Sequence, residues 1–373
     1  MNRLLFAAPL VAVALVAQFQ PVSAQNATAP DAKELQAVQD KAYDFLKGKQ
    51  GEDGSFLPKV GPGVTALTAA AMVKSGKTPD DPVVAKAIEY VTKYVQKDGG
   101  VYSRGLETYT TALAIVAFKE CNKDGKYDKV IEAAVKYLKA VQDGSGTDDK
   151  ELKFGGAGYG KGGGRPDTSN TAFFVEALIA SGAKQDDPAV KKALTFLSRA
   201  QNLPGEFNDQ PFAKKADEAD KGGFVYEPGA QDDEKSSKRA KGGGLRSEGG
   251  MTYAGLKSFL FAGLGKNDPR VKAAVAWIAK NYTLEENPGM KQSGLFYYYH
   301  TFAKAMDALG EDEFTDAKGT KHPWKKELFD TLSEKQAKDG SWVNATDRNY
   351  MEDSPELCTA FAMLSLSYTK AKK

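Results

Sequence analysis

Thr65-Ala66-Leu67 opens a run of small apolar residues, TALTAAAMV, and this opening decides the fold because it returns along the chain. A threonine followed by an apolar, small-residue run occurs six times. The later openings are Thr111-Ala112-Leu113, Thr171-Ala172-Phe173, Thr252-Tyr253-Ala254, Thr301-Phe302-Ala303 and Thr359-Ala360-Phe361. Repeats at this spacing indicate one supersecondary unit that is copied, each copy hiding its apolar face against its neighbours.

A second kind of segment lies between these openings. Sequences such as VVAKAIEYVTKYVQ (83–96) and AVKKALTFLSRAQ (189–201) carry apolar residues at i, i+3, i+4 and i+7 with lysines between them, which is typical of half-buried helices. Three such segments begin with Asp-Pro, a helix cap followed by a first-turn proline. The three caps are Asp81, Asp187 and Asp268.

The two kinds of segment alternate along the chain. Most of the amphipathic helices end at a glutamine followed by a turn, as in QGEDGSF (50–56) and QAKDGSW (336–342), where Asp-Gly supplies the positive φ that stops a helix. The segments that open with threonine are apolar nearly all round and therefore predict buried helices. We predict an all-α protein, an α/α toroid of about six helical hairpins with amphipathic helices outside and apolar helices inside.

The N-terminus has the pattern of a cleaved signal peptide. Arg3 supplies a positive charge, residues 4–17 are apolar but too short to cross a bilayer, and Val22-Ser23-Ala24 is a small-residue cleavage site. We therefore expect a signal peptide at 1–24, a polar tail at 25–34 and one toroid domain at 35–373. The mature protein is expected to be secreted or periplasmic, with no transmembrane segment.

Three connections are longer than the others, near 143–168, 202–250 and 282–296. Loops of this length in a compact domain are usually functional or disordered. Charge gives no sign of nucleic-acid binding, since 51 basic residues balance 49 acidic ones. Cys121 and Cys358 fall on the second and sixth units, so two buried free thiols are favoured over a disulfide. Neither cysteine has a metal-ligand spacing, and we expect no metal and no other cofactor.

The repeats resemble a known family. Hairpins ending in Gln, a short turn and Gly-x-aromatic resemble those of squalene–hopene cyclases, oxidosqualene cyclases and prenyltransferase β subunits, over essentially the whole mature chain. The sequence looks most similar to the secreted bacterial prenyltransferase/squalene oxidase repeat proteins. The resemblance implies a terpenoid cyclase-like toroid. One fold hosts many chemistries, so it does not by itself imply a reaction.

The cyclase acid is not intact in this sequence. Cyclases of this kind protonate an alkene through Asp-x-Asp-Asp-Thr-Ala at the mouth of an inner helix. The matching stretch runs from Asp167 to Ala172, with Ser169 and Asn170 in place of the second and third acids. A serine hydroxyl is too weak an acid for this step. Asp167 could replace it only if burial raised its pKa, and it could instead simply cap the helix.

The zinc site of prenyltransferases is not intact either. The resemblance implies a zinc ion held by Asp, Cys and His, the histidine lying in a Tyr-His-Thr run. Tyr299-His300-Thr301 resembles that run, but the stretch Ser247–Thr252 carries no thiol where the Asp-x-Cys pair should lie. One matching ligand does not make a zinc site.

The mouths of the inner helices nevertheless collect chemistry-bearing residues. If the ring closes, they face one central funnel that could bind an isoprenoid-like hydrocarbon or stack on sugar rings. Asp167, Tyr299 and His300 are the candidate catalytic residues. The candidate ligand-binding residues are Tyr109, Asn170, Arg246, Tyr253, Tyr297 and Tyr298.

Three functions remain open at this point. The first is a binding protein for a small apolar or isoprenoid-like molecule. The second is an enzyme, either cyclase-like or a polysaccharide lyase or hydrolase built on an α/α toroid with a glycan substrate. The third is a scaffold that docks a protein partner through the charged insertion at 213–243.

Overall fold

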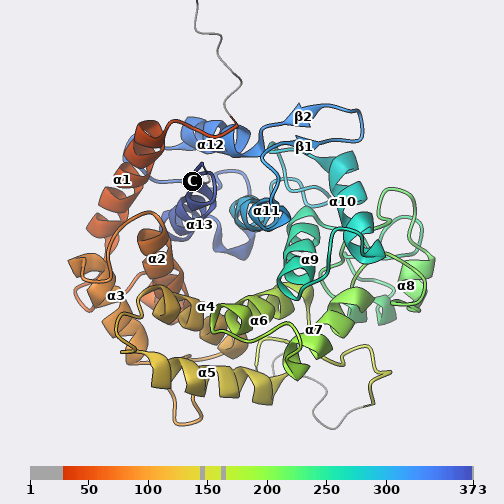
Figure 1. Cartoon of the computed structure of the whole chain (residues 1–373), viewed down its shortest axis with the longest axis horizontal. Helices are drawn as coiled ribbons and strands as arrows, with labels where there is room; N and C mark the ends of the chain where they lie inside the picture. Colours follow the sequence, from red (N-terminus) through yellow and green to blue (C-terminus); the bar gives the residue numbers. More distant parts are fainter. Residues whose placement is uncertain (1–27, 143–147, 161–164, 372–373) are drawn as a thin grey trace, which may run out of the picture.

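The computed structural model describes residues 28–142, 148–160 and 165–371. The predicted signal peptide, the start of the polar tail and parts of the connection at 143–168 lie outside these ranges. Twelve longer helices within them alternate between two concentric layers (Figure 1). The outer layer holds α1 (Ala32–Lys49), α3 (Pro82–Thr92), α5 (Asp128–Val141), α7 (Pro188–Arg199), α10 (Pro269–Asn281) and α12 (Trp324–Lys335).

The inner layer is a closed ring. Its helices are α2 (Gly63–Lys74), α4 (Glu107–Glu120), α6 (Thr168–Ala180), α9 (Gly249–Phe261), α11 (Leu295–Leu309) and α13 (Pro355–Ser367). Each inner helix packs on the next one along the chain, and α13 packs back on α2 (Figure 1). The prediction of an all-α toroid of six hairpins is therefore confirmed for the described part of the chain.

Burial follows the two sequence patterns. The outer helix α5 buries one stripe, Ile131, Ala134, Tyr137 and Leu138, and turns its lysines to solvent. The inner helix α2 is buried without interruption from Gly63 to Met72. A helix between two layers of neighbours has no face left for water, which is why the inner segments are apolar nearly all round.

The Asp-Pro starts act as predicted. The side chains of Asp81, Asp187 and Asp268 accept hydrogen bonds from first-turn N–H groups of α3, α7 and α10, and proline follows at the first helical position. Capping of this kind fixes where each outer helix begins, and therefore how far the turn before it can extend.

The glutamines that end outer helices join neighbouring hairpins. The Nε2 group of Gln142 donates to the carbonyl of Gly155 in its own turn and to that of Ala189 in the next outer helix, both at 2.9 Å. Three other glutamines make the same pair of bonds. They are Gln50 to Gly54 and Val83, Gln201 to Gly222 and Arg270, and Gln336 to Gly340 and Val38. The last of these closes the ring, because it joins α12 to α1.

Glycine in these turns is required by a close approach. A Cβ on Gly155 would lie 1.9 Å from the Lys192 carbonyl oxygen of α7, and the φ of this glycine is +81°. Equivalent glycines lie against the next outer helix in four other turns. They are Gly54, Gly99, Gly222 and Gly340, with φ between +90° and +92°. Only glycine combines this backbone conformation with contact to a neighbouring backbone.

The recurring threonine ties each turn to its inner helix. Thr65 Oγ1 accepts a 2.9 Å hydrogen bond from the N–H of Phe56, two residues after the turn glycine. The same bond recurs in four more units. It joins Thr111 to Val101, Thr171 to Ala157, Thr252 to Phe224 and Thr359 to Trp342. Thr301 differs, since its hydroxyl donates to the carbonyl of Tyr298.

The connections carry short elements. These are α8 (Pro211–Lys214), the 3₁₀ turns η1 (Pro58–Val60), η2 (Pro228–Asp232) and η3 (Asn349–Met351), and an antiparallel pair, β1 (Phe314–Thr315) with β2 (Lys321–His322). In that pair Phe314 lies opposite His322 and Thr315 opposite Lys321. Cys121 and Cys358 are free and buried, as favoured from their positions. None of the helices in the described ranges has the length and apolar character needed to span a bilayer.

Candidate functional site

The N-terminal ends of the inner helices surround one cavity of about 230 Å³. Every inner helix contributes its first turns or its cap, because all the hairpins run in the same sense round the ring. The residues at these N-terminal ends that line the cavity include Val64 of α2, Thr110 of α4, Asn170 of α6, Met251 of α9 and Leu357 of α13. An apolar cavity of roughly 150 Å³ already admits benzene, so this one has room for a larger apolar molecule.

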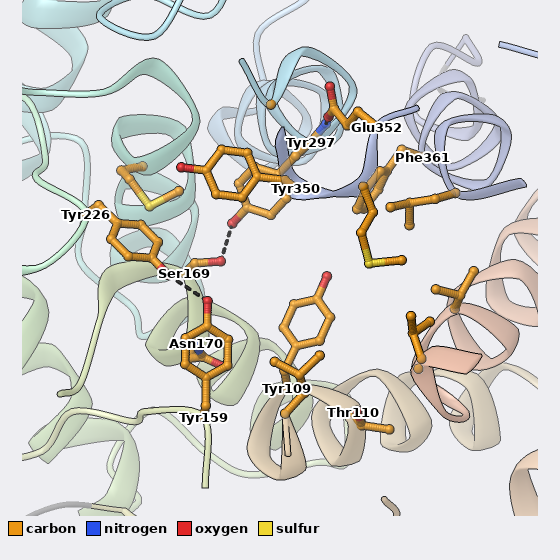
Figure 2. A pocket seen from close by; sticks show the side chains of 18 of the residues that line it. Tyr109, Thr110, Tyr159, Ser169, Asn170, Tyr226, Tyr297, Tyr350, Glu352 and Phe361 are labelled. Atoms are coloured by element: carbon orange, nitrogen blue, oxygen red, sulfur yellow. Dashed lines mark hydrogen bonds between the residues drawn. The ribbon is translucent and has the colours of Figure 1, made fainter. Parts of the chain in front are cut away.

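Aromatic rings form much of the wall (Figure 2). Tyrosine rings come from helices α4 and α11 and from three separate connections, and one phenylalanine comes from α13. They are Tyr109, Tyr297, Tyr159, Tyr226, Tyr350 and Phe361. Methionine sulfurs and aliphatic groups fill the spaces between the rings, namely Met251, Met290, Met351, Val60, Val64, Leu106 and Leu357.

Several of the tyrosine hydroxyls are already engaged. The hydroxyls of Tyr159 and Tyr226 lie 2.7 Å apart, and that of Tyr297 lies 2.9 Å from Ser169 Oγ (Figure 2). Burial raises the pKa of Tyr109, Tyr226 and Tyr297 above its ordinary value. The phenols therefore stay neutral at physiological pH.

Ser169 occupies the position where the resemblance implies the proton-donating acid. It lines the cavity and touches Tyr297, which lies across the ring on α11. Asn170, beside it, also lines the cavity. Asp167 is the N-cap of α6, and its carboxylate accepts from the Asn170 N–H at 2.8 Å and from Asn170 Nδ2 at 2.7 Å. Burial raises the pKa of Asp167 to about 7. Asp167 itself lies behind the wall, and Asn170 separates it from the cavity.

Two carboxyl groups do reach the cavity, Glu352 and Glu248. Glu352 is fully buried, and its Oε1 accepts from the N–H groups of Phe296 and Tyr297 at the start of α11, each at 2.9 Å. Its Oε2 accepts from Asn344 Nδ2 at 2.9 Å. Burial raises the pKa of Glu352 in spite of these bonds.

Glu248 is the cap residue of α9. Arg246 Nη2 lies 3.3 Å from Glu248 Oε1 and 3.1 Å from the sulfur of Met290. Burial raises the pKa of Glu248, and the positive charge of Arg246 offsets only part of that effect. Arg246 therefore pairs with the carboxylate of Glu248, which lines the cavity, but Arg246 does not line the cavity itself.

The mouth of the cavity is strained and apolar. Tyr350 and Met351 of η3 have φ of 57° and 63°, and Leu106, before α4, has φ of 51°. Non-glycine residues in this region are uncommon and cluster where surrounding structure imposes them. Tyr350 is 58% exposed, Leu106 38% and Met351 37%, and all three line the cavity. These three side chains therefore form an edge of the cavity that is exposed to solvent.

Three predicted site tyrosines lie away from the cavity. The hydroxyl of Tyr298 donates to the Thr283 carbonyl at 2.6 Å, and that of Tyr299 donates to the Leu284 carbonyl at 2.7 Å. Tyr253 is 1% exposed and packs edge-on against Tyr298. Tyr298 and Tyr299 therefore anchor the connection between α10 and α11. Successive residues of a helix point in different directions, so the three tyrosines at 297–299 cannot all line one funnel.

His300 lies beneath the cavity floor. Its ring packs between Phe173, at 6.4 Å between centroids, and Phe361, at 5.3 Å. Burial holds the pKa of His300 far below its ordinary value, and the charge of Lys304 adds to the effect. The imidazole is neutral and outside the cavity. No group of three His, Cys, Asp or Glu side chains suited to a metal gathers in residues 28–142, 148–160 and 165–371.

A buried ion cluster lies deeper in the ring. Glu176 of α6 bonds both Lys257 of α9, at 2.5 Å, and Lys304 of α11. Lys257 also lies 5.7 Å from the centre of the Phe173 ring, which separates the cluster from Tyr109 and the cavity above. Each of the three charges lies in a largely apolar segment of the sequence. A charged residue within an apolar segment indicates an oppositely charged partner in the core, because burying an unpaired charge costs free energy.

The structure therefore brings together Tyr109, Asn170 and Tyr297 of the predicted residues. Sequence reasoning missed the other half of the wall, chiefly Tyr159, Tyr226, Tyr350, Glu248 and Glu352. The glycine runs next to Tyr159 and Tyr226 indicated either close backbone approach to another group or a flexible linkage. The rest come from connections, whose path a periodic pattern does not predict.

Comparison with known proteins agrees with this architecture. Residues 56–216 match the family model of the squalene-hopene cyclase C-terminal domain. None of the curated proteins matches the chain. A type II terpene cyclase, MstE from Scytonema, solved as a variant in complex with geranylgeranyl dihydroxybenzoate, aligns over 90% of this chain and 97% of its own, with TM-score 0.53 and 13% identity.

Other solved structures share the fold. A protein from Actinoplanes aligns over 90% of this chain and 99% of its own, with TM-score 0.54 and 16% identity. A possible glycoside hydrolase family 105 member from Salmonella enterica aligns over 96% and 98%, with TM-score 0.55 and 14% identity. At these identities the likeness is one of fold. The protein has an α/α toroid of the prenyltransferase and squalene cyclase type.

Proposed function

We propose that this is an exported toroid that binds a small apolar, isoprenoid-like molecule in its central cavity. The observation that carries the proposal is the wall itself, in which rings, methionines and aliphatic groups from five of the six inner helices and from the connections converge on one space. Pockets of this composition bind ligands chiefly by removing apolar surface from water. The terpene cyclase MstE, which shares the fold, is described with a geranylgeranyl compound, which supports the choice of probe.

The proposal does not include cyclisation by the usual route. Ser169 holds the position of the proton donor, and its hydroxyl cannot protonate an alkene. Asp167 is behind the wall, and its carboxylate is occupied in capping α6. Prenyl transfer through zinc is not supported either, since His300 lies under the floor, packed between two phenylalanine rings.

A sugar substrate is the weaker alternative. Glycoside hydrolases share the fold, but the likeness at 14% identity extends to the fold alone. Hydrolysis of a glycosidic bond needs two carboxyl groups free to act on it. Here Glu352 is held by the N-terminus of α11, and Glu248 is held by Arg246.

Calorimetry with farnesol as probe tests the proposal. We expect one site per chain and a negative heat-capacity change, which marks burial of apolar surface. Val64→Phe should weaken binding about tenfold or more, because the larger ring would occupy part of the cavity. Val73→Phe, the same change at the other end of α2, is the control and should bind like the parent protein.

Material from the native host supplies a second test. Native mass spectrometry with organic extraction, applied to the extracytoplasmic fraction, should detect the protein lacking residues 1–24 together with a bound apolar molecule. Recovery of full-length protein from the cytoplasm would contradict export. A folded protein that takes up no farnesol and instead binds oligosaccharides would contradict the proposed ligand class.

A further inference from the structure

The cavity wall has the composition of an aromatic cage. Six rings from separate elements line the space, and three of their hydroxyls are engaged in the pairs Tyr159–Tyr226 and Tyr297–Ser169 (Figure 2). The electron-rich face of an aromatic ring attracts a cation, most strongly where water is excluded, and cages of such rings recognise ammonium groups. The same wall holds three methionines and four aliphatic side chains, so rings make up about half of its apolar lining.

The charges on the wall have one sign. Among the lining residues that the structure describes, the ionisable groups other than phenols are Glu248 and Glu352. Glu352 is satisfied by backbone N–H groups and by the Asn344 amide, which carry no net charge. A buried carboxylate without a nearby cation is destabilised, and a positively charged ligand would supply the missing charge.

The nearby cations are already paired. Arg246 bonds Glu248 and Met290, as described above. Lys238 Nζ lies 4.4 Å from the centre of the Tyr226 ring and 2.6 Å from Glu227 Oε2, so one ring of the cage already holds a cation. Below the floor, both lysines of the ion cluster bond Glu176, and the Phe173 ring lies between Lys257 and Tyr109 of the cavity wall.

We infer that the cavity selects a hydrophobic ligand that carries a positive charge, an amine or quaternary ammonium group on an isoprenoid-like skeleton. This inference rests on the proposed function and narrows its ligand class. The cage would hold the ammonium group against the rings and near Glu248 and Glu352, while the methionine and aliphatic part of the wall would hold the hydrocarbon chain.

A matched pair of probes tests the charge. Geranyltrimethylammonium and its neutral analogue, with carbon in place of nitrogen, have the same shape and nearly the same apolar area. We expect the ammonium compound to bind at least about tenfold more tightly by calorimetry at physiological salt, the range that desolvated cation–ring contacts provide.

Substitutions at Tyr350 test whether the aromatic rings cause the tighter binding of the ammonium compound. This residue lines the cavity yet is 58% exposed, so changing it should leave the core intact. Tyr350→Leu removes the ring but keeps apolar bulk, and should reduce the preference for the cation about threefold or more. Tyr350→Phe keeps the ring at the same backbone conformation and should retain the preference.

The outcomes separate the inference from the proposed function. Tighter binding of the cation, lost in Tyr350→Leu and kept in Tyr350→Phe, supports the inference. Equal binding of both probes, tighter binding of the neutral one, or a preference that survives Tyr350→Leu overturns the inference and leaves the apolar binding function standing. If neither probe binds the folded protein, both the function and the inference fail.

Discussion

At the scale of single residues, Asp167 shows how burial changes the meaning of a motif position. It matches the first acid of the cyclase motif, and sequence alone left two roles open, a proton donor or a helix cap. The structure shows the cap, with Asn170 between the carboxylate and the cavity. The pKa of Asp167 is nevertheless raised to about 7, because burial disfavours its charge.

This raised pKa predicts a pH-dependent stability. Between about pH 4 and pH 7 the folded carboxyl keeps a proton that the unfolded chain has released, so the stability contribution of Asp167 falls as pH rises through that window. Asp167→Asn retains a side chain that can cap α6, and it removes the fall in stability that occurs as Asp167 loses its proton. Relative to the parent, the variant should gain roughly 1–4 kcal/mol between pH 4 and pH 8, measured by urea unfolding.

Asp187 is the matched control for that experiment. It caps α7 in the same way, but the bond to Lys139, against the effect of burial, holds its pKa below the ordinary value. Its stabilisation is present above the unfolded pKa and is lost as pH falls, so Asp187→Asn should lose stability relative to the parent as pH rises. Parallel pH profiles for the two variants would contradict the assignment for Asp167.

At the scale of elements, the turn after an outer helix forms the joint between neighbouring hairpins. In four of the six units, a glutamine amide, a glycine and a threonine act together in it. In the third unit, Gln142 bonds the next outer helix, Gly155 lets that helix approach, and Thr171 ties the turn to the inner helix. The order of these residues in the sequence therefore records contacts between successive hairpins.

The joint predicts a difference between two glycine substitutions. Gly222→Ala would place a Cβ 2.4 Å from the Ala273 carbonyl oxygen, whereas Gly182→Ala, also at positive φ, would meet nothing within 4 Å. The backbone cost of about 1 kcal/mol is common to both. We expect Gly222→Ala to lower the free energy of unfolding by roughly 2 kcal/mol more than Gly182→Ala, measured by chemical denaturation. Equal losses in the free energy of unfolding would show that the close approach of Gly222 to α10 does not contribute to stability.

At the scale of the whole molecule, the inner ring surrounds polar groups at two levels. The upper level is the cavity with its two carboxyl groups. The lower level is the cluster in which Glu176 of α6 bonds Lys257 of α9 and Lys304 of α11. Burial alone would raise the pKa of Glu176, but the two lysines outweigh burial and hold it below its ordinary value. Burial lowers the pKa of Lys304 to about 8.

Removing the shared carboxylate should destabilise the ring. Glu176→Gln leaves two buried ammonium groups without a counter-charge, and we expect a loss of about 3–5 kcal/mol in urea unfolding. The pair Lys74–Glu120, joined at 2.7 Å but about a quarter exposed, is the control, and Glu120→Gln should cost less than about 1 kcal/mol. A triple replacement of the cluster by Leu, Met and Met should recover most of the loss. Failure to recover would mean that the cluster has a role beyond charge balance.

The sequence by itself determined the toroid, because the repeat encodes contacts that recur in register from one hairpin to the next. Threonine, glycine, glutamine and Asp-Pro each fix a local bond, and apolar periodicity decides which helices are buried. The same reasoning placed Tyr109, Asn170 and Tyr297 at the cavity, since each lies in the first turns of an inner helix.

The tertiary structure alone decided the rest of the site. Tyr297 lines the cavity, whereas Tyr298, Tyr299 and His300, the next residues of α11, do not. The orientation of α11 about its own axis decides which of these side chains reaches the cavity. The opposite wall comes from irregular connections, whose course depends on contacts distant in sequence, such as Tyr159 to Tyr226. Local patterns fix bonds within a repeat, whereas the shape and charge of the cavity are set by how six repeats and their connections converge.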